Sequence, residues 1–408
     1  MSARRVSIEV RLASLAIVAA ASATTTACAA IWGFEDLSGP DAGDEVGPGR
    51  DGGSDTALAP PDGSRDTAPT DGPLPDSTVP DDAPTDTGAQ GGGDATVCST
   101  GWVQQAEVFE GGTMQAAVSG VWGSSAADVY AVGFDPSDDA VIVHSTGNGV
   151  WTRQTVGSGG MQQGLVSVWG SGAGDVYAAG NEVIFHSTGN GTWTSEDVPG
   201  GSYGALWGSG PGDVYALSGG TGGFVAHSTG DGTWTVLQTS LGSQVSFAGI
   251  WGSSAADVYV VGGDAMGNPL IAHSSGGSSM FVAQTVPVLT SFEDSLVAVW
   301  GSGAADVYAL STNGTILHST GNGTWAAQVT ATQINYDYFA IWGSGPNDIY
   351  IGTTGGEALH STGNGSWSNV AIGTANQVST SHLWGSGPCD VYAVGSDIDD
   401  DGVILHGP

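Results

Sequence analysis

The chain has 408 residues and a formal net charge of −35 at pH 7, with 41 acidic residues against six Lys and Arg. All six cations are Arg, and Arg153 is the only one after residue 65. A nucleic-acid binder needs cationic side chains to displace counterions from phosphates, so this charge balance excludes a nucleic-acid partner. It also excludes electrostatic adsorption to an anionic membrane surface.

The first 28 residues have the composition of an export signal. A short basic segment, MSARRVSIEVR, precedes an Ala-rich apolar run that is too short to span a bilayer. The run reaches Cys28 through Thr-Thr-Ala, which resembles a bacterial lipobox, where the Cys is lipidated and becomes the first residue. We predict a lipoprotein-type signal peptide over residues 1–28, lipidation of Cys28 and, because Ala29 is not Asp, an outer-membrane or cell-surface location. The alternative is an ordinary signal peptide cut near Ala29 or Ala30, which would give a periplasmic or secreted protein.

Residues 29–97 form a segment of different composition. Asp, Gly, Pro, Thr, Ser and Ala dominate it, and no aromatic residue follows Phe34 until Trp102. Such a segment cannot bury enough apolar surface to offset the entropy of an ordered chain. We therefore predict a disordered acidic tether, with a root-mean-square reach of roughly 45 Å for about 65 flexible residues.

From residue 98 onward the sequence is periodic. The phrase VWGSSAADVYAVG returns in seven related copies, each with an Asp six residues and a Tyr eight residues after its Trp. The repeated Trp residues are Trp122, Trp169, Trp207, Trp251, Trp300, Trp342 and Trp384. Each copy also has a third apolar run that ends in His, and in most copies a fourth run is opened by Trp. Four short β-rich runs per unit of about 40 residues predict an all-β fold, a seven-bladed β-propeller of four-stranded blades over residues 98–408. A solenoid is the structural alternative.

The two ends of the repeat region complement each other. The last copy stops after its third run, at residues 403–406, so its fourth strand is missing. The segment CSTGWVQQAEVF at residues 98–109 resembles a turn and a fourth strand that precede the first copy. We predict that these segments pair and close the ring, because an open ring would leave unpaired strand edges.

The phrase HSTGNGTW at His318–Trp325, with close copies in most blades, is expected to form the tight turn between the third and fourth strands. It resembles the Asp-box of bacterial neuraminidase-type repeats, Ser-x-Asp-x-Gly-x-Thr-Trp, and the architecture is similar to that of WD40- and YVTN-type propellers. The resemblance covers residues 98–408 and implies a structural turn, not an enzyme.

One face of the predicted propeller is uniform and the other is varied. We name the four strands of each blade A, B, C and D in chain order. The connections from strand A to B and from C to D are almost constant in length, whereas those from B to C and from D to the next A differ between copies. Because loops on a rigid scaffold carry function, we predict that the face with the B–C and D–A connections, here named the varied face, binds a partner.

Repeated polar residues are interpreted as scaffold. We expect each strand-C His to be hydrogen-bonded within its own blade, since one His per blade cannot converge on a metal ion. We expect the Asp before each Val-Tyr or Ile-Tyr pair to bond turn amides. The alternative for these Asp residues is a carboxylate ring around a central cation. The His residues are His144, His186, His227, His273, His318, His360 and His406, and His382 lies outside this pattern.

One acidic loop resembles the start of a calcium-binding loop. Asp397, Asp399 and Asp401 alternate before a Gly, although the twelfth position is Pro408 instead of Glu. A second acidic loop, at residues 134–140, lies in the equivalent connection of the first blade. We predict Ca²⁺ as the one possible cofactor at Asp397, Asp399 and Asp401, with a solvated acidic loop as the alternative.

Cysteine usage predicts one disulfide bond. With Cys28 lipidated, Cys98 and Cys389 remain in an oxidising compartment, where a pair usually bridges. Both map to the blade in which the termini meet, but strands B and D of one blade are about 10 Å apart, so the chain before Trp102 must bend inward. Two free thiols are the alternative.

Catalysis finds little support in the sequence. The neuraminidase resemblance would imply an arginine cluster around an acidic sugar, and the repeats contain only Arg153. Glycosidases need two carboxylates at a defined separation, and the Glu residues of the repeats are scattered. We predict a monomeric, non-catalytic binding module for an unknown protein or glycan ligand, which touches the membrane only through its lipid anchor. The alternatives are a propeller-class glycoside hydrolase or lyase and a structural surface or adhesion protein.

Overall fold

A computed structural model describes residues 98, 101–105, 117–157, 162–220, 222–237, 239, 241–275, 280–287, 294–328, 337–372, 378–399 and 401–408. The predicted signal peptide, Cys28 and the predicted tether lie outside the described residues. Within these residues, no helix is long and apolar enough to cross a membrane.

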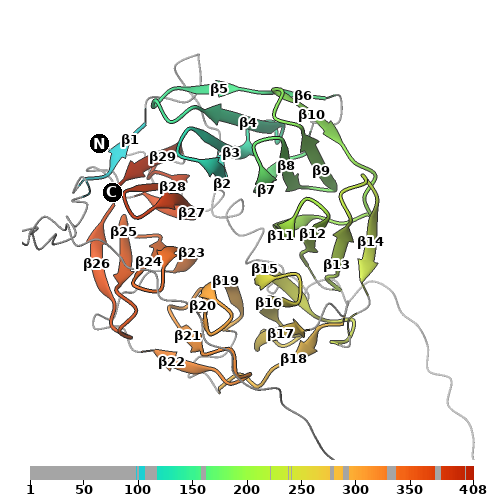
Figure 1. The fold of residues 1–408 in the computed structure, drawn as a ribbon, viewed down its shortest axis with the longest axis vertical. Helices are drawn as coiled ribbons and strands as arrows, with labels where there is room; N and C mark the ends of the chain where they lie inside the picture. The colour runs from blue at the N-terminus through green and yellow to red at the C-terminus, as the bar shows by residue number, and fades with distance from the viewer. Residues whose placement is uncertain are drawn as a thin grey trace, which may run out of the picture. The chain divides into compact units, whose positions relative to one another are not determined.

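Seven β-sheets are arranged like blades around a central opening, with the innermost strand of each blade beside the axis (Figure 1). The predicted all-β, seven-bladed propeller is thereby confirmed. The strands of blades one to four are β2 (Ala117–Ser125), β3 (Asp128–Phe134), β4 (Ala140–Ser145) and β5 (Trp151–Arg153); β7 (Leu165–Gly172), β8 (Asp175–Gly180), β9 (Val183–Ser187) and β10 (Thr192–Ser195); β11 (Tyr203–Gly210), β12 (Asp213–Ser218), β13 (Val225–Ser228) and β14 (Trp234–Leu237); and β15 (Ser246–Ser254), β16 (Asp257–Gly263), β17 (Pro269–Ser275) and β18 (Val282–Ala283).

The strands of blades five to seven are β19 (Leu296–Gly303), β20 (Asp306–Ser311), β21 (Ile316–Ser319) and β22 (Ala326–Gln328); β23 (Tyr338–Gly345), β24 (Asp348–Thr353), β25 (Glu357–Ser361) and β26 (Ser368–Ala371); and β27 (Ser379–Gly387), β28 (Asp390–Ser396), β29 (Gly402–Gly407) and β1 (Val103–Gln104). Strands within each blade are antiparallel, and the short strand β6 (Thr155–Val156) adds a parallel edge to blade two. The order A, B, C, D runs outward from the axis (Figure 1).

The ring closes as the two ends of the repeat region predict. Strand β1, from the start of the repeat region, pairs antiparallel with β29, from its end, with Val103 opposite His406. Figure 1 shows β1 completing the outside of the blade that holds β27, β28 and β29. This pairing removes the edge that β29 would otherwise expose.

The hydrophobic core lies between blades and not at the axis. Strands with the pattern Asp-Val-Tyr-Ala are buried on both sides, because each blade is packed between two others. In the cluster between blades one and two, Tyr130 and Val132 of β3 meet Val176 of β8 and Phe185 of β9. An interior strand buried on both faces reads as a nearly continuous apolar run.

The repeated Trp-Gly pair explains how neighbouring blades fit together. Each strand-A Trp lies against the Gly that follows the Trp of the next blade, so that a Cβ on Gly343 would be 2.6 Å from the ring of Trp300. The series continues around the ring and closes where Trp384 of blade seven meets Gly123 of blade one. A side chain of any size at this Gly would displace the neighbouring indole, so Trp and Gly repeat together.

The outer aromatic residues form a second contact between blades. Tyr308 of blade five meets Trp367 of blade six edge to face, with ring centroids 6.1 Å apart. The same pair recurs at four other boundaries. In blade four, Phe281 replaces the Trp and is fully buried in the corresponding cluster with Tyr215 at its edge. Phe281 thus fills the position that Trp holds in the other blades, so the position accepts an aromatic ring other than indole.

Candidate functional site

On the uniform face, each blade carries a Ser, an Asp and a His that bind one another. In blade five, Asp306 Oδ1 accepts a hydrogen bond from His318 Nε2 at 2.8 Å, and Oδ2 accepts one from Ser302 Oγ at 2.6 Å. A carboxylate can only accept, so Nε2 carries the proton. The equivalent trios of the other blades are Ser124, Asp128 and His144; Ser171, Asp175 and His186; Ser209, Asp213 and His227; Ser253, Asp257 and His273; Ser344, Asp348 and His360; and Ser386, Asp390 and His406.

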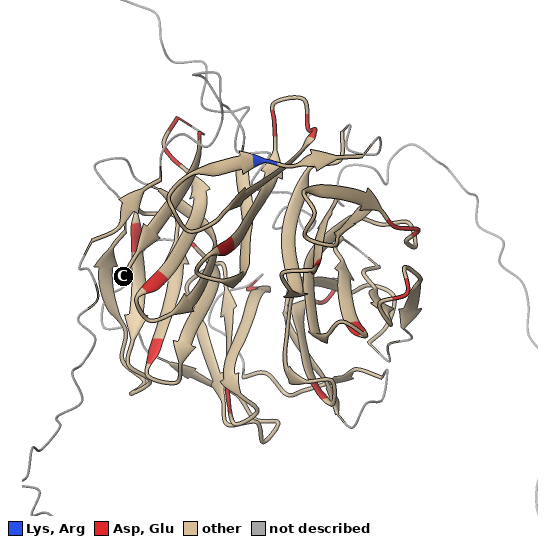
Figure 2. Ribbon diagram, turned by 45° about the horizontal axis from the view of Figure 1, so that its top comes forward, with Lys and Arg blue, Asp and Glu red and all other residues tan. Residues whose placement is uncertain are grey.

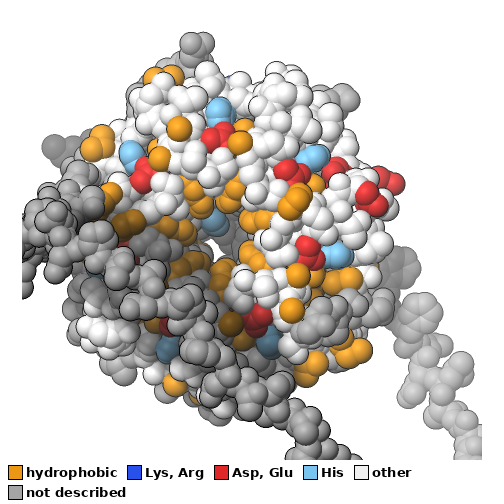
Figure 3. Space-filling model, in the orientation of Figure 1, with side chains coloured by type: hydrophobic (Ala, Val, Ile, Leu, Met, Phe, Trp, Pro, Cys, Tyr) orange, Lys and Arg blue, Asp and Glu red, His pale blue; other side chains and the backbone are white. Residues whose placement is uncertain are grey.

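These trios correct one expectation and agree with another. The His residues are hydrogen-bonded within their own blades, as expected. The Asp residues were expected to bond turn amides, and that assignment was wrong, because their carboxylates instead join strand B to the end of strand C. Figure 3 shows acidic and His side chains side by side in successive blades. The Ser donates to the Asp and not to the His, so the arrangement does not activate a Ser nucleophile.

A Tyr ring covers the inner side of each His. The ring of Tyr308 lies 4.5 Å from that of His318, and burial, with a smaller contribution from the charge of Asp306, raises the pKa of Tyr308 to about 12. The Tyr hydroxyl is therefore neutral at physiological pH. Each trio is enclosed by its own blade and has no geometry for binding a shared ion.

The phrase HSTGNGTW has the turn geometry that its residues predict. Ser319 Oγ accepts a hydrogen bond from the Gly321 amide at 3.2 Å, and Asn322 Oδ1 accepts one from the Thr324 amide at 2.9 Å. Gly321 has φ +76°, and a Cβ there would be 1.9 Å from the carbonyl oxygen of Ala304 in the neighbouring A–B turn. The Gly is therefore required by its backbone conformation and by its close approach to another turn.

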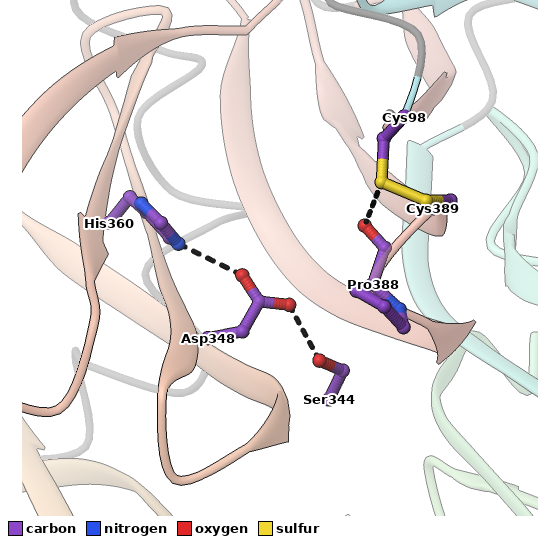
Figure 4. The surroundings of a disulfide bond; sticks show 6 residues. All are labelled: Cys98, Ser344, Asp348, His360, Pro388 and Cys389. Carbon is purple, nitrogen blue, oxygen red and sulfur yellow. Dashed lines mark hydrogen bonds and ion pairs between the residues drawn. A yellow bond between two sulfur atoms is a disulfide. The ribbon is translucent and has the colours of Figure 1, made fainter. Parts of the chain in front are cut away.

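The closing blade contains the cysteine pair. The structure joins Cys98 and Cys389 by a disulfide bond with their Cα atoms 5.0 Å apart (Figure 4). A sulfur of this bond lies 3.6 Å from the carbonyl oxygen of Pro388. Cys98 thus lies at the A–B turn of blade seven, which places the bond across the seam of the ring. Figure 4 also shows one trio of the adjacent blade six, Ser344, Asp348 and His360.

The predicted calcium loop has a conformation that does not depend on three carboxylates. Asp397 Oδ1 accepts the amides of Asp399 and Asp401 at 3.0 and 3.1 Å. The B–C loop of blade four has the same bonds, from the amides of Met266 and Asn268 to Asp264, with one carboxylate. No group of three metal-binding side chains gathers within the part of the chain that the structure describes. Calcium binding at this loop stays a prediction.

A cavity of about 320 Å³ lies on the propeller axis. Its wall is formed by the strand-A segments that precede the repeated Trp residues, in all seven blades, and by Phe134, Asp138, Asn181 and Ser396 at the ends of strand B or in the B–C connections. The B–C connections belong to the varied face, so the cavity lies at that end of the axis. Figure 3 shows the opposite, uniform face, where hydrophobic side chains also surround the central opening.

The wall of this cavity is divided into two unlike halves. Among the described lining residues, blades three to six contribute only Gly and apolar residues, such as Leu206, Ile250 and Ile341. Every polar residue of the described lining comes from blades seven, one and two. These residues are Ser119, Asp138, Ser167, Asn181, Ser381, His382 and Ser396. The sevenfold repeat is therefore broken at the axis, and the break is confined to one side.

His382 occupies a position where the other six blades have Gly, Ala or Ser. It stands two residues before Trp384, and the equivalent residue of blade two, Ser167, accepts a hydrogen bond from the amide of Leu206 in the next blade at 3.0 Å. Burial lowers the pKa of His382 to about 4, and a backbone hydrogen bond with Val121 of blade one opposes this effect. The imidazole is therefore neutral at physiological pH, and its Nδ1 has no partner among the described residues.

The described residues of the cavity wall include no Lys or Arg. Arg153 is the only Lys or Arg among the described residues, and it lies at the end of β5, the outermost strand of blade one. Figure 2 shows acidic residues distributed over many blades with almost no basic residue among them. An acidic ligand would therefore meet no compensating charge at the axis.

Comparisons with known proteins support the fold class. No family model and no curated protein matches the chain. Among solved structures, YCF48 bound to D1 peptide is 14% identical with a TM-score of 0.57, and the match covers 75% of this chain and 95% of that one. Virginiamycin B lyase from Staphylococcus aureus is 14% identical with a TM-score of 0.62, over 75% and 98% of the two chains.

The WD40 β-propeller domain of Doa1 is 14% identical with a TM-score of 0.57, over 76% of this chain and 98% of that domain. At these identities the likeness shows the fold alone. The chain is thus a seven-bladed β-propeller whose structural neighbours include a peptide-bound protein, a lyase and a WD40 domain.

Proposed function

We propose that this chain is an exported, lipid-anchored propeller that binds a protein partner through its varied face without catalysing a reaction. The observation that carries the proposal is the contrast between the two faces. On the uniform face the repeated Ser, Asp and His side chains hydrogen-bond one another within each blade. At the other end of the axis the chain presents a cavity whose wall departs from the repeat.

Among the described residues, the two most exposed large apolar side chains lie on the varied face, while Val150 and Met280, in C–D connections, are less exposed at 60% and 55%. Met266 and Ile398 are 75% and 66% exposed, and both lie in B–C connections, of blades four and seven. Large apolar side chains at loop tips gain free energy when a partner covers them. The similar structure of YCF48 bound to D1 peptide supports a protein partner, because it shows a propeller that holds a peptide.

The lining of the cavity favours binding over catalysis. Asp138 and His382 are the titratable residues among the described lining residues. A glycoside hydrolase of the usual kind needs two carboxylates that flank the scissile bond, and this wall supplies one. A lyase-type reaction by His382 is the alternative, and it predicts loss of turnover, not of partner binding, in a His382→Ser variant.

Site-specific photocrosslinking in the native host tests the proposed face. A photoreactive residue would be placed at Met266 or at Ile398, and in matched controls at Asn148 or Asn322, which are exposed in C–D turns of the uniform face. We expect one protein to be crosslinked from both varied-face positions and from neither control. The same protein, once purified, should bind the purified chain. Crosslinks from the C–D turns alone, or no reproducible crosslink from residues 266 and 398, would contradict the proposal.

A further inference from the structure

The divided wall of the central cavity has a consequence for small molecules that does not depend on a protein partner. A ligand that fills the cavity must place one side against the apolar surface of blades three to six, which includes Leu206 and Ile250. Its other side meets hydroxyl, amide, imidazole and carboxylate groups of blades seven, one and two. Covering a polar group without giving it a hydrogen-bond partner costs free energy, so a ligand with a polar edge on this side is favoured over a wholly apolar one.

The charges at the cavity select among polar ligands. Asp138 is the one charged residue of the described lining at neutral pH, and it is exposed in the B–C loop of blade one. Its carboxylate makes no hydrogen bond or ion pair with the described residues. The side chain of Asp135, not that of Asp138, bonds the amides of this loop, at Ser137 and Asp139. An anion would be repelled by Asp138 and would find no cation, whereas a protonated amine would be attracted.

The size of the cavity limits the apolar part of the ligand. A volume of about 320 Å³ lies at the lower end of the range of small-molecule sites. It accommodates a fused aromatic bicycle with a short side chain, but not an oligosaccharide or a folded loop.

We propose that the central cavity binds a small amphipathic amine, with its apolar body against blades three to six and its ammonium group beside Asp138. The polar groups of the second wall complete the site: Ser119, Ser396 and the side-chain amide of Asn181 can hydrogen-bond one edge of the ligand, whereas Ser167 and Ser381 already bond backbone groups. This binding requires no covalent step and no further cofactor.

Three indole compounds of equal framework and different charge test the proposal. Tryptamine is cationic, tryptophol is neutral and indole-3-acetate is anionic. Binding to the purified full chain is measured by calorimetry and ligand-observed NMR. The buffer contains about 0.15 M salt, which screens the general electrostatic field of an acidic protein. We expect tryptamine to bind with a Kd of about 1 mM or below, tryptophol about fivefold more weakly and indole-3-acetate not detectably. Ethylamine, which has the charge without the apolar body, should not bind.

Two glycines of one strand provide a matched pair of variants. Gly204 lines the cavity at the start of β11, and Gly210 ends the same strand at the opposite face. A Cβ on either residue would have no heavy atom within 4 Å, so both positions accept a side chain without a clash at Cβ. Gly204→Leu should fill the cavity and weaken tryptamine binding about tenfold or more, whereas Gly210→Leu should leave it unchanged.

A third variant tests the charge. Asp138 has φ +62°, a conformation that Asn tolerates, so Asp138→Asn should keep the loop and reduce tryptamine affinity to that of tryptophol. Three outcomes would each overturn the proposal. The first is equal affinity for the three indoles, and the second is undetectable tryptamine binding at 5 mM of added ligand, about five times the expected Kd. The third is unchanged tryptamine binding by a folded Gly204→Leu protein. If Gly204→Leu misfolds, the proposal is still tested by the Asp138→Asn variant and by the comparison of the three indoles with ethylamine. None of these outcomes depends on whether a protein binds the varied face.

Discussion

Replacing His382 by Ser should make the stability of this propeller less sensitive to acid. Ser is the residue that blade two uses at the equivalent position, where its hydroxyl accepts an amide of the next blade. The substitution therefore keeps a residue that the fold accepts and removes the one imidazole that lies between blades at the axis. The quantity of interest is the change in the free energy of unfolding between pH 7.5 and pH 4.

The magnitude follows from the pKa of His382. Burial lowers this pKa from 6.5 to about 4, so the folded state favours the neutral imidazole. As pH falls below 6.5, the unfolded chain takes up a proton that the folded chain binds only near pH 4, and stability decreases. The difference of about 2.5 pH units corresponds to a loss of about 3 kcal/mol, which the wild type should suffer and the variant should not.

The assay is reversible urea unfolding of both proteins, with the disulfide intact, at several pH values from 7.5 to 4. Other titrating groups, including the seven His–Asp pairs, are common to the two proteins, so the difference between the two pH profiles isolates His382. At pH 7.5 the absolute stabilities are not compared, because the substitution also changes packing. Parallel profiles for the wild type and His382→Ser would refute the reasoning, since they would mean that the imidazole is as easily protonated in the folded protein as in the unfolded one.

Three further predictions concern the ring and the anchor. Gly343→Ala should lower the free energy of unfolding by about 1–3 kcal/mol in the same urea assay, because its Cβ would be 2.6 Å from the indole of the preceding blade. Gly345→Ala is the control and should have little effect, because open space surrounds its Cβ. The exported protein should contain no alkylatable thiol at Cys98 or Cys389 without reductant, and Cys389→Ser should cost at most about 5 kcal/mol of stability; two thiols that react under denaturing conditions would contradict the bond. Metabolic labelling with palmitate should mark the protein in a Gram-negative host and be lost in Cys28→Ser; label that persists in this variant would refute lipidation at that residue.

The fold could be predicted because its signals are repeated and local. Seven copies of one Trp, Asp and Tyr spacing set the number of blades, and the missing fourth strand after residue 406 set the closure. Register and turn type followed from Gly positions such as Gly321, whose positive φ no bulkier residue adopts easily. Sequence could not show why Trp and Gly repeat together, since Trp384 and Gly123 lie at opposite ends of the ring's sequence and meet only after closure.

The polar trios illustrate a limit of local reasoning. An Asp beside a tight turn usually bonds turn amides, and this led to the wrong partner for Asp306 and its equivalents. The His that bonds Asp306 lies 12 residues away, at the end of strand C, and becomes its neighbour only because strands B and C pair in register. The constant spacing of the A–B and C–D connections was the available signal, since only equal connections bring both residues to one face in every blade.

A repeat protein carries its own comparison set, and this changes how its site can be found. Positions that hold the same residue in seven blades are explained by what every blade must do, such as placing Trp on Gly or Asp on His. A residue that departs from six equivalents is not required by that frame. His382 is such a departure, as is the accumulation of polar lining residues in blades seven, one and two. Blade seven, on the same side of the ring, also holds the seam and the Cys98–Cys389 bond, so the asymmetric wall lies beside the covalent link between the two ends of the repeat region. Side chains that recognise a ligand must stay fixed, and this covalent link restrains the blade that carries His382.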